Sequence, residues 1–302
     1  MGYLDGKVIA ITGSGRGIGR AVALAAAAEG AAVVVNDYGV SIAGEEPTSD
    51  VANEVVAEIE VAGGRAVANA SSVTTMEGGA SIVQSAIDTF GRLDGVVCVA
   101  GILRERMLFN MSEEEWDPVI ETHLKGTFTV FRAAAPVFRA QKSGTLLGFT
   151  SGAFAGSIGQ ANYSAAKGGI VSLVRSAAAG MYKYGVTSNC IAPVAKSRMS
   201  GNVPFGIEMG EPEDVAPMVL FLLGDDSRHV TGQVYTANGG KLAVWNQPVE
   251  VREIRTEGRW TPAEIAEHFE ELGQERLELL DLIEQREKAA AEAKAAGTTP
   301  NR

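Results

Sequence analysis

Short apolar runs alternate along the chain with longer segments whose apolar residues recur at helical spacing. The apolar runs cover residues 7–12, 31–36, 65–70, 93–99, 144–150, 186–192 and 232–237. Continuous rather than alternating apolar strands are typical of a parallel sheet with helices on both faces. The helical spacing covers residues 17–29, 49–62, 79–90, 112–139, 160–183 and 212–223. With right-handed crossovers, this order predicts an α/β fold with an open, doubly wound parallel sheet.

The alternation stops after Trp245, and residues 246–302 are charged and helix-prone. A capping-box pattern with proline at the first helical position begins at Thr261 and predicts a helix start there. Apolar residues then recur at helical spacing at Leu277, Leu280 and Ile283. We therefore expect one domain over residues 1–245 and a helical extension over 246–302, ending in a fraying helix and disorder.

Composition and charge narrow the class of protein. The chain has 302 residues, of which 46% are hydrophobic, so it can bury a sizeable core. Its net charge of −11 argues against a nucleic-acid partner. Cys98 and Cys190 lie in apolar runs, which predicts isolated buried thiols without a disulfide or a metal site. Neither a signal peptide nor a membrane-spanning run is visible, so we expect a soluble, cytoplasmic protein with no membrane partner.

The sequence TGSGRGIG at residues 12–19 follows the first strand and opens the first helix. Glycines at positions 13, 17 and 19 allow positive φ angles and let a pyrophosphate approach the backbone. The helix N-terminus attracts the negative charge of such a group. A tight turn without a ligand is the alternative, but the strand before and the helix after favour a dinucleotide site.

Asp37 ends the second predicted strand. A carboxylate at this position can accept hydrogen bonds from both ribose hydroxyls of an adenosine and would repel the 2′-phosphate of NADP. The residue therefore predicts NAD as the cofactor. The alternative is a simple turn aspartate before Gly39.

Tyr163 and Lys167 lie four residues apart in GQANYSAAKGG and should share one helix face. Lowering the pKa of a tyrosine from about 10 to about 7 takes about 4 kcal/mol. A lysine charge about 4 Å away, at an effective dielectric constant of about 20, supplies that amount. The pair therefore predicts a proton-transfer group, with a hydroxyl from Ser151 or Thr150 to orient the substrate oxygen. The alternative is an incidental tyrosine and a solvated lysine on an amphipathic helix.

Together, TGxxxGxG, Asp37 and YxxxK resemble the short-chain dehydrogenase/reductase family over about residues 5–245. The resemblance implies a Rossmann-type, NAD-binding domain with a built-in catalytic site that interconverts an alcohol and a carbonyl, in a homodimer or homotetramer. It makes Tyr163 the general acid/base, Lys167 the group that lowers its pKa and holds the nicotinamide ribose, and Ser151 the substrate-oxygen ligand. The cofactor contacts it implies are Gly13, Ser14, Arg16, Gly17, Ile18, Gly19, Asp37, Ser72, Val73, Ala100, Gly101, Tyr163, Lys167, Pro193 and Ser197.

Segments such as VVVNDYG, AGILRERM and GQANYSAAK, and the long loop 38–50, also resemble the (3R)-hydroxyacyl-CoA dehydrogenase unit of peroxisomal multifunctional enzyme type 2, or 17β-hydroxysteroid dehydrogenase type 4. This likeness implies oxidation of (3R)-3-hydroxyacyl-CoA to 3-ketoacyl-CoA by a stand-alone relative, since no hydratase sequence follows. A steroid or terpenoid alcohol dehydrogenase and a cofactor-binding scaffold without turnover remain alternatives. Candidate ligands for coenzyme A phosphates, unless they are ordinary surface charges, are Arg104, Arg106, Lys196 and Arg198.

Several positions depart from the family pattern. Val99 stands where the family usually has asparagine, which removes hydrogen bonds to the backbone of the site. His123 stands where most members place the asparagine of a catalytic tetrad, and it either supports catalysis or is a plain helix-face residue. The usual spacing before Tyr163 selects Thr150, whereas counting along the strand from Gly144 selects Ser151, which we prefer. In the extension, apolar anchors that could cover a pocket or mediate assembly are Trp260 and Phe269.

Overall fold

The computed structural model describes residues 2–39, 48–196, 209–273 and 276–295. The chain forms two compact units, Met1–Trp245 and Asn246–Arg302. The first unit carries the sheet and all the candidate site residues, and the second contains two helices.

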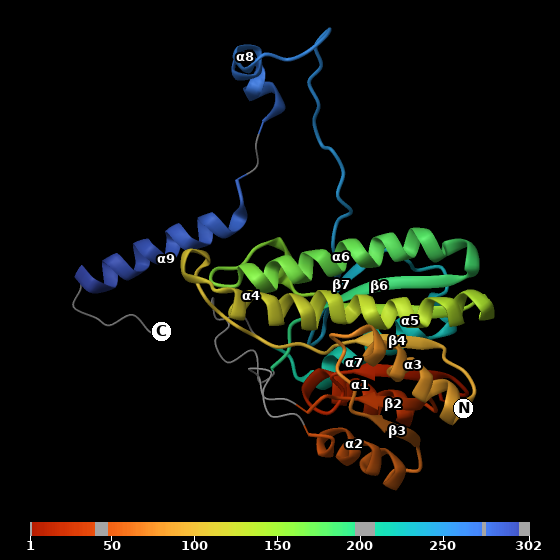
Figure 1. Cartoon of the computed structure of the whole chain (residues 1–302). Coiled ribbons are helices and arrows are strands. Elements are labelled where there is room, and N and C mark those ends of the chain that lie inside the picture. The colour runs from red at the N-terminus through yellow and green to blue at the C-terminus, as the bar shows by residue number, and fades with distance from the viewer. Residues whose placement is uncertain (1, 40–47, 197–208, 274–275, 296–302) are drawn as a thin grey trace. The chain divides into compact units, whose positions relative to one another are not determined.

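An eight-stranded sheet with the order β3-β2-β1-β4-β5-β6-β7-β8 forms the centre of the first unit (Figure 1). Its strands are β1 (Val8–Thr12), β2 (Ala32–Asn36), β3 (Arg65–Asn69), β4 (Gly95–Cys98), β5 (Gly144–Phe149), β6 (Val186–Pro193), β7 (Val234–Asn238) and β8 (Lys241–Val244). Strands β1 to β7 run parallel, which confirms the predicted doubly wound sheet. Strand β8 was not predicted; it pairs antiparallel with β7 after a two-glycine turn.

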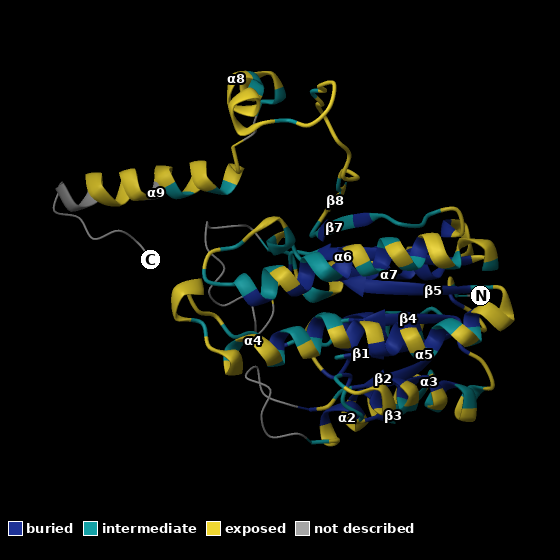
Figure 2. Cartoon of the chain, turned by 45° about the horizontal axis from the view of Figure 1, so that its top comes forward, coloured by how far each residue is buried: buried dark blue, intermediate teal, exposed yellow. Residues whose placement is uncertain are grey.

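Helices cover both faces of the sheet, and their inner sides are buried (Figure 2). One face is covered by α1 (Gly17–Ala28), α2 (Asp50–Val61) and α7 (Ala216–Leu223). The other is covered by α3 (Met76–Phe90), α5 (Gly126–Gln141) and α6 (Ala161–Met181). The strands are buried from both sides, and this is why their apolar runs are continuous rather than alternating.

Two helices differ from their predicted form. Helix α3 begins at Met76, three residues before the predicted start, because the Thr75 side chain caps it by accepting from the Gly78 amide. The predicted helix over 112–139 is continuous but contains a π-helical turn at Glu121–Lys125, between α4 (Glu113–Ile120) and α5. Such turns are often found at functional sites, and this one carries His123.

A row of small residues crosses the middle of the sheet beneath α6. Cys98, Gly148 and Cys190 are in register on β4, β5 and β6, and both cysteines are buried free thiols, as predicted. A Cβ atom on Gly148 would lie 2.9 Å from Ile170 Cγ2 and 3.0 Å from Val174 Cγ2. Helix α6 therefore packs directly on the backbone of β5.

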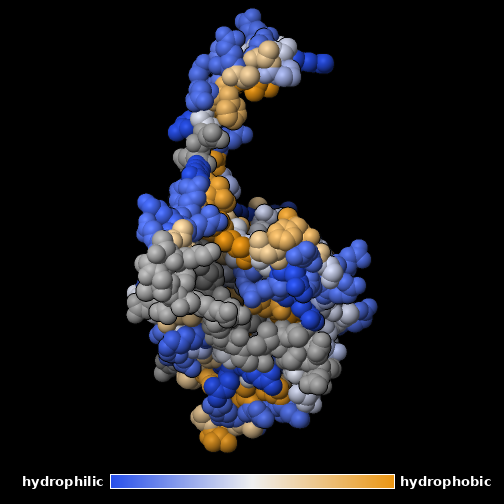
Figure 3. All heavy atoms as spheres, turned by 90° about the vertical axis from the view of Figure 1, so that its left-hand side faces the viewer, coloured by the Kyte–Doolittle hydropathy of each residue, from blue (hydrophilic) through white to orange (hydrophobic). Residues whose placement is uncertain are grey.

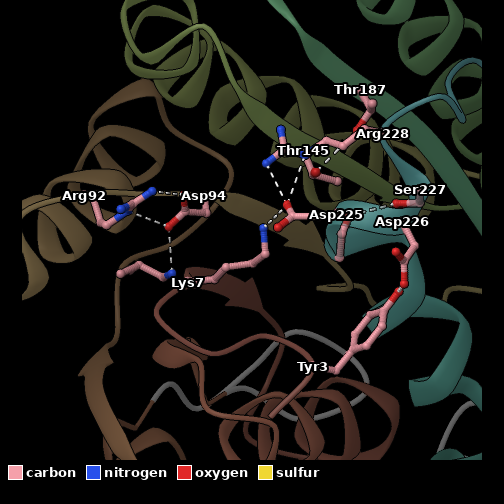
Figure 4. Close-up of polar contacts among 12 residues, drawn as sticks. Tyr3, Lys7, Arg92, Asp94, Thr145, Thr187, Asp225, Asp226, Ser227 and Arg228 are labelled. Atoms are coloured by element: carbon pink, nitrogen blue, oxygen red, sulfur yellow. Dashed lines mark hydrogen bonds and ion pairs between the residues drawn. The ribbon is translucent and has the colours of Figure 1, made fainter. Parts of the chain in front are cut away.

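Polar contacts close the edge of the sheet where the parallel strands begin (Figure 4). Asp94 is buried, accepts from the Val8 amide at 2.9 Å and forms a bidentate ion pair with Arg92. Lys7 Nζ lies 2.7 Å from Asp225 Oδ1, a hydrogen bond that lowers the pKa of this carboxyl group. These contacts hold the start of β1 in place, and the opposite edge carries the candidate site.

The second unit contains α8 (Pro262–Leu272) and α9 (Glu278–Ala295). The predicted capping box at Thr261 is present, with Glu264 as its partner. No residue of α8 is buried. The helix exposes the apolar side chains of Ile265 and Phe269 among charged ones, and apolar and polar surface alternate in this unit (Figure 3). Within the described ranges, the helices are all too short or too polar to span a bilayer.

Candidate active site

The candidate residues follow the carboxyl ends of the parallel strands, so they meet at one edge of the sheet. The strand order reverses between β1 and β4, and α/β sheets of this type bind ligands in the crevice outside such a point. Around this point lie the glycine loop after β1, Asp37 after β2, Ser72 and Val73 after β3, Ala100 and Gly101 after β4, Ser151 after β5 and Pro193 at the end of β6. Ser197, predicted as a cofactor contact, lies outside the described residues.

Each glycine of the loop between β1 and α1 has its own steric reason. Gly13 has φ of +63°, and a Cβ atom there would lie 2.7 Å from Ala100 Cα. A Cβ atom on Gly19 would lie 2.1 Å from the Gly13 carbonyl oxygen. Gly17 has φ of +52° and faces open space at the first turn of α1. The loop therefore packs tightly against the end of β4 and leaves room beside the helix N-terminus, which fits a pyrophosphate.

The other predicted residues of this loop have structural contacts of their own. Ser14 is buried, and its hydroxyl donates to the Ile11 carbonyl oxygen at 2.7 Å. Arg16 is the N-cap residue of α1 but makes no side-chain cap hydrogen bond. Ile18 packs against the hydrophobic core. The N-cap side chain therefore leaves the first amides of α1 available to an anion.

Asp37 is held by two backbone amides. Its Oδ2 atom accepts from Gly15 and its Oδ1 atom from Gly39, each at 2.8 Å. An ionised carboxylate has about four lone-pair sites, so about two remain for hydroxyl donors. A Cβ atom on Gly15 would lie 2.8 Å from Asp37 Oδ2, so only glycine allows this approach. The arrangement fits a ribose diol.

The loop after β3 borders the same edge. Ser72 and Thr74 share a hydrogen bond of 3.0 Å between their hydroxyl groups. Val73 is buried, and its carbonyl oxygen accepts from Thr129 on α5 at 2.6 Å. This hydrogen bond fixes the loop to helix α5.

Thr12 is a structural residue of the site that our sequence analysis did not single out. Its hydroxyl oxygen accepts from the backbone amides of Val99 and Ala100, both at 3.2 Å. These are the amides at the position where the family usually has asparagine. Thr12 therefore holds the end of β4 beside β1, while the Val99 side chain packs against the core. The only sequence signal for this role is its position as the first residue of the glycine motif.

Ser151 and Thr150 have different surroundings. Thr150 is buried, and its hydroxyl donates to the Lys167 carbonyl oxygen at 2.9 Å. Ser151 is partly exposed and caps the 3₁₀ turn η3 (Gly152–Ala155), and its hydroxyl lies near enough to Tyr163 to lower the pKa of the phenol. Ser151 therefore faces the phenol, whereas Thr150 fixes β5 to α6.

Tyr163 and Lys167 lie one turn apart on α6. Lys167 is buried, and its ammonium group donates to the Phe149 carbonyl oxygen at 2.6 Å and lies 5.3 Å from the centre of the Tyr163 ring. Burial raises the pKa of Tyr163 to about 12 and lowers the pKa of Lys167 to about 7. The prediction that the lysine charge by itself brings the tyrosine pKa near 7 is therefore wrong. Loss of solvation disfavours the phenolate, and the same loss weakens the charge that was expected to stabilise it.

His123 is part of this cluster and not a solvent-facing helix residue. It is buried, its Nε2 atom lies 2.8 Å from the Ile102 carbonyl oxygen, and its ring meets that of Tyr163 edge-on at 5.1 Å. Burial holds its pKa well below the usual value, so the imidazole is neutral. Among the described residues its Nδ1 atom has no hydrogen-bond partner. A Cβ atom on Gly101 would lie 2.2 Å from this ring, so the glycine makes room for the histidine.

Asn162 is a second residue that our sequence analysis missed. It is buried at the start of α6, and its amide group donates to the carbonyl oxygens of Arg104 at 2.9 Å and Glu115 at 2.7 Å. Its side-chain oxygen accepts from the Tyr163 amide at 2.7 Å. The first turn of α6 is thereby tied to the segment after β4. A polar residue just before a helical tyrosine is the only signal the sequence offers.

The predicted phosphate-binding cations are largely engaged with carboxylates. Arg106 lies 2.8 Å from Glu115, and Lys196 lies 2.5 Å from Glu211. Arg198 lies outside the described residues. These ion pairs reduce the net positive charge that the rim of the site was expected to present.

Comparisons with known proteins agree with this geometry. The sequence profile of the family described as enoyl-(acyl carrier protein) reductase matches residues 13–241. The crystal structure of a short chain dehydrogenase from Mycobacterium avium is 46% identical and superposes with a TM-score of 0.82, covering 91% of this chain and 97% of its own. The hydroxyacyl-CoA dehydrogenase ChsB1 of Mycobacterium tuberculosis is 40% identical over 281 residues, 87% of each chain. The peroxisomal multifunctional enzyme type 2 of Mus musculus is 42% identical over 274 residues, which are 89% of this chain but 37% of the mouse protein.

Proposed function

Because the chain belongs to the short-chain dehydrogenase/reductase family, we propose that it is an NAD-dependent oxidoreductase that interconverts (3R)-3-hydroxyacyl-CoA and 3-ketoacyl-CoA. The observation that carries the proposal is the position of Tyr163 beside buried Lys167 and near the Ser151 hydroxyl, at the carboxyl ends of the strands that also carry the glycine loop. This arrangement supports the proposal, because a substrate-oxygen ligand and a proton-transfer group are needed side by side next to a dinucleotide site.

The cofactor would be held by the glycine loop, Asp37 and Lys167. Asp37 favours NAD over NADP, because its carboxylate can accept from a ribose diol and would repel a 2′-phosphate. When bound, the oxidised cofactor would supply a hydride acceptor and a positive charge that would lower the pKa of a neighbouring phenol. A ratio of kcat/KM for NAD over NADP that falls at least about tenfold in Asp37→Ser would support this role; an unchanged ratio would contradict it.

The proton moves between the substrate oxygen and the Tyr163 hydroxyl. Because burial raises the pKa of Tyr163 to about 12, this phenol keeps its proton at neutral pH even with Lys167 beside it, and a further positive charge is needed to release the proton. Ser151 orients the substrate oxygen toward the phenol, and neutral His123 supports the ring from its edge. Proton transfer is thereby coupled to binding of the oxidised cofactor.

The substrate class rests on the named relatives and on exposed apolar residues near the site. Arg106 pairs with Gln160 through a backbone bridge, which brings the segment after β4 beside the start of α6. Next in this segment, Leu108 is 70% exposed and Phe109 is 77% exposed. Exposed apolar side chains there favour a substrate with a large apolar part, either an acyl chain or a steroid.

NADH absorbance tests the proposal with a panel of (3R)- and (3S)-3-hydroxyacyl-CoA esters, hydroxysteroids, terpenoid alcohols and simple alcohols. We expect the (3R)-hydroxyacyl-CoA with NAD to give the highest kcat/KM and Tyr163→Phe to lower it about 10²- to 10⁴-fold. The matched control is Tyr182→Phe, since Tyr182 is 72% exposed at the far end of α6. Faster turnover of a steroid would favour the alternative substrate, and no turnover would favour a cofactor-binding scaffold.

A second measurement tests the coenzyme A moiety. Lys196→Ala and Arg104→Ala should raise KM for the CoA thioester far more than for its pantetheine analogue, if these cations contact the phosphates. Equal effects on both substrates would contradict that contact.

The extension and the assembly are part of the same proposal. We expect a homodimer or homotetramer in which residues 246–302 cover a substrate pocket or join subunits. A chain truncated after Trp245 should then change in turnover or in oligomer size. If neither changes, both roles are excluded.

A further inference from the structure

We propose that Trp245 is a positioning residue that fixes the η3 turn through Phe154 and thereby fixes the Ser151 hydroxyl. The inference rests on the proposed function, in which Ser151 orients the substrate oxygen. It concerns a residue more than ninety positions away in the sequence, which no motif of the active site includes.

Trp245 is itself firmly held. Its indole N–H donates to Thr236 Oγ1 on β7 at 2.9 Å, and its backbone amide donates to the Val234 carbonyl oxygen at 3.0 Å. Its ring packs against that of Phe154 at a centroid distance of 4.6 Å and an interplanar angle of 63°. The tryptophan therefore connects strand β7 to the η3 turn.

Phe154 and Ser151 belong to the same short turn. The Phe154 amide donates to the Ser151 carbonyl oxygen at 2.9 Å, and the Ser151 hydroxyl oxygen accepts from the Ala153 amide at 3.3 Å. A shift of the phenylalanine ring therefore moves the backbone that carries the serine.

The turn packs against helix α6, and the aromatic contact with Trp245 holds its outer side chain, Phe154, against the core. It is four residues long, begins at Gly152 and is followed by Gly156. Gly152 is exposed, with no atom within 4 Å of its Cβ position, and Gly156 has φ of +114°. Glycine restricts the backbone less than any other residue. The Trp245–Phe154 contact therefore restrains a turn whose glycines leave its backbone free to shift, and with it the position of Ser151 relative to Tyr163.

The test is a double-mutant cycle in the full chain, using Trp245→Ala, Ser151→Ala and the double variant. We expect Trp245→Ala to lower kcat about 10- to 100-fold, the loss typical of a misplaced catalytic group, while the directly measured Kd for NADH stays within about twofold. In the Ser151→Ala background the same substitution should change kcat less than about twofold, because the two residues act as a unit. Trp245→Phe keeps an aromatic ring against Phe154 and should restore most of the activity, and Tyr182→Ala is the control for loss of an exposed ring.

An equal loss of kcat in both backgrounds would overturn the inference, as would a Trp245→Ala variant with unchanged kcat. A chain that turns over none of the tested alcohols would refute the proposed function, yet the positioning role would still be measurable. Hydrogen exchange at the Phe154 and Gly156 amides, both bonded within η3, should then be faster in Trp245→Ala than in Tyr182→Ala. Equal exchange in the two variants would overturn it.

Discussion

Replacing Lys167 by methionine should change the stability of the protein in a way that depends on pH. The lysine is buried, and burial lowers its pKa from the usual 10.5 to about 7. Between these two pH values the unfolded chain binds a proton that the native protein does not, so the free energy of unfolding rises with pH across this range. Below pH 7 the full difference applies and destabilises the native protein by about 5 kcal/mol, at about 1.4 kcal/mol for each pH unit.

This destabilisation decreases by about 2 kcal/mol between pH 7 and pH 9. Over that interval the lysine stays mostly protonated in the unfolded chain, whereas in the native protein it loses its proton. Lys167→Met has no titrating group at this position. The difference in the free energy of unfolding between wild type and variant should therefore change by about 2 kcal/mol in favour of the wild type over that interval. The hydrogen bond to the Phe149 carbonyl oxygen is lost at both pH values and cancels in the comparison.

Urea unfolding at pH 7 and pH 9, without nucleotide and at one protein concentration, measures the difference between wild type and variant. Lys241→Met, at an exposed position on β8, is the control and should show the same difference at both pH values. If this difference is the same at pH 7 and pH 9, the argument that burial lowers the pKa of Lys167 is refuted.

Other predictions concern the cofactor loop and a helix cap. Gly13→Ala should weaken NADH binding at least about tenfold by calorimetry, because its Cβ would lie 2.7 Å from Ala100 Cα; normal affinity would contradict this. Thr12→Val should lower the free energy of unfolding by about 1–3 kcal/mol in urea, because the Val99 and Ala100 amides lose their acceptor, and a loss below about 0.5 kcal/mol would count against it. Thr75→Ala should cost about 1 kcal/mol in thermal unfolding, the usual effect of a lost cap.

The sequence predicted the parts of the fold in which local pattern and burial agree. The seven continuous apolar runs are strands because both faces of the sheet are covered. Strand β8 was missed because it is short and largely exposed, and only its pairing with β7 defines it. The start of α3 was missed because Gly78 and Gly79 disfavour a helix. They occur there because a Cβ on either would collide with the backbone, at Ser72 and Thr129 respectively.

Within the candidate site, spacing predicted which side chains come together but not their electrostatics. The one-turn separation places Tyr163 and Lys167 side by side, as expected. Counting residues could not distinguish Ser151 from Thr150, because the count depends on the length of the loop. The structure distinguishes them, because the Thr150 hydroxyl donates to the Lys167 carbonyl oxygen. The direction of the tyrosine pKa depends on burial, which results from the whole fold.

The spacing between β5 and α6 depends on the absence of a side chain at Gly148. The side chain missing from β5 sets the separation between the strand that leads to Ser151 and the helix that carries the phenol and the ammonium group. An alanine there would have to push the helix outward by a fraction of an ångström, and overpacking of this kind costs about 1–3 kcal/mol of stability. Deep in the sheet, a single methyl group would thus lower the melting temperature and also displace the phenol and the ammonium group.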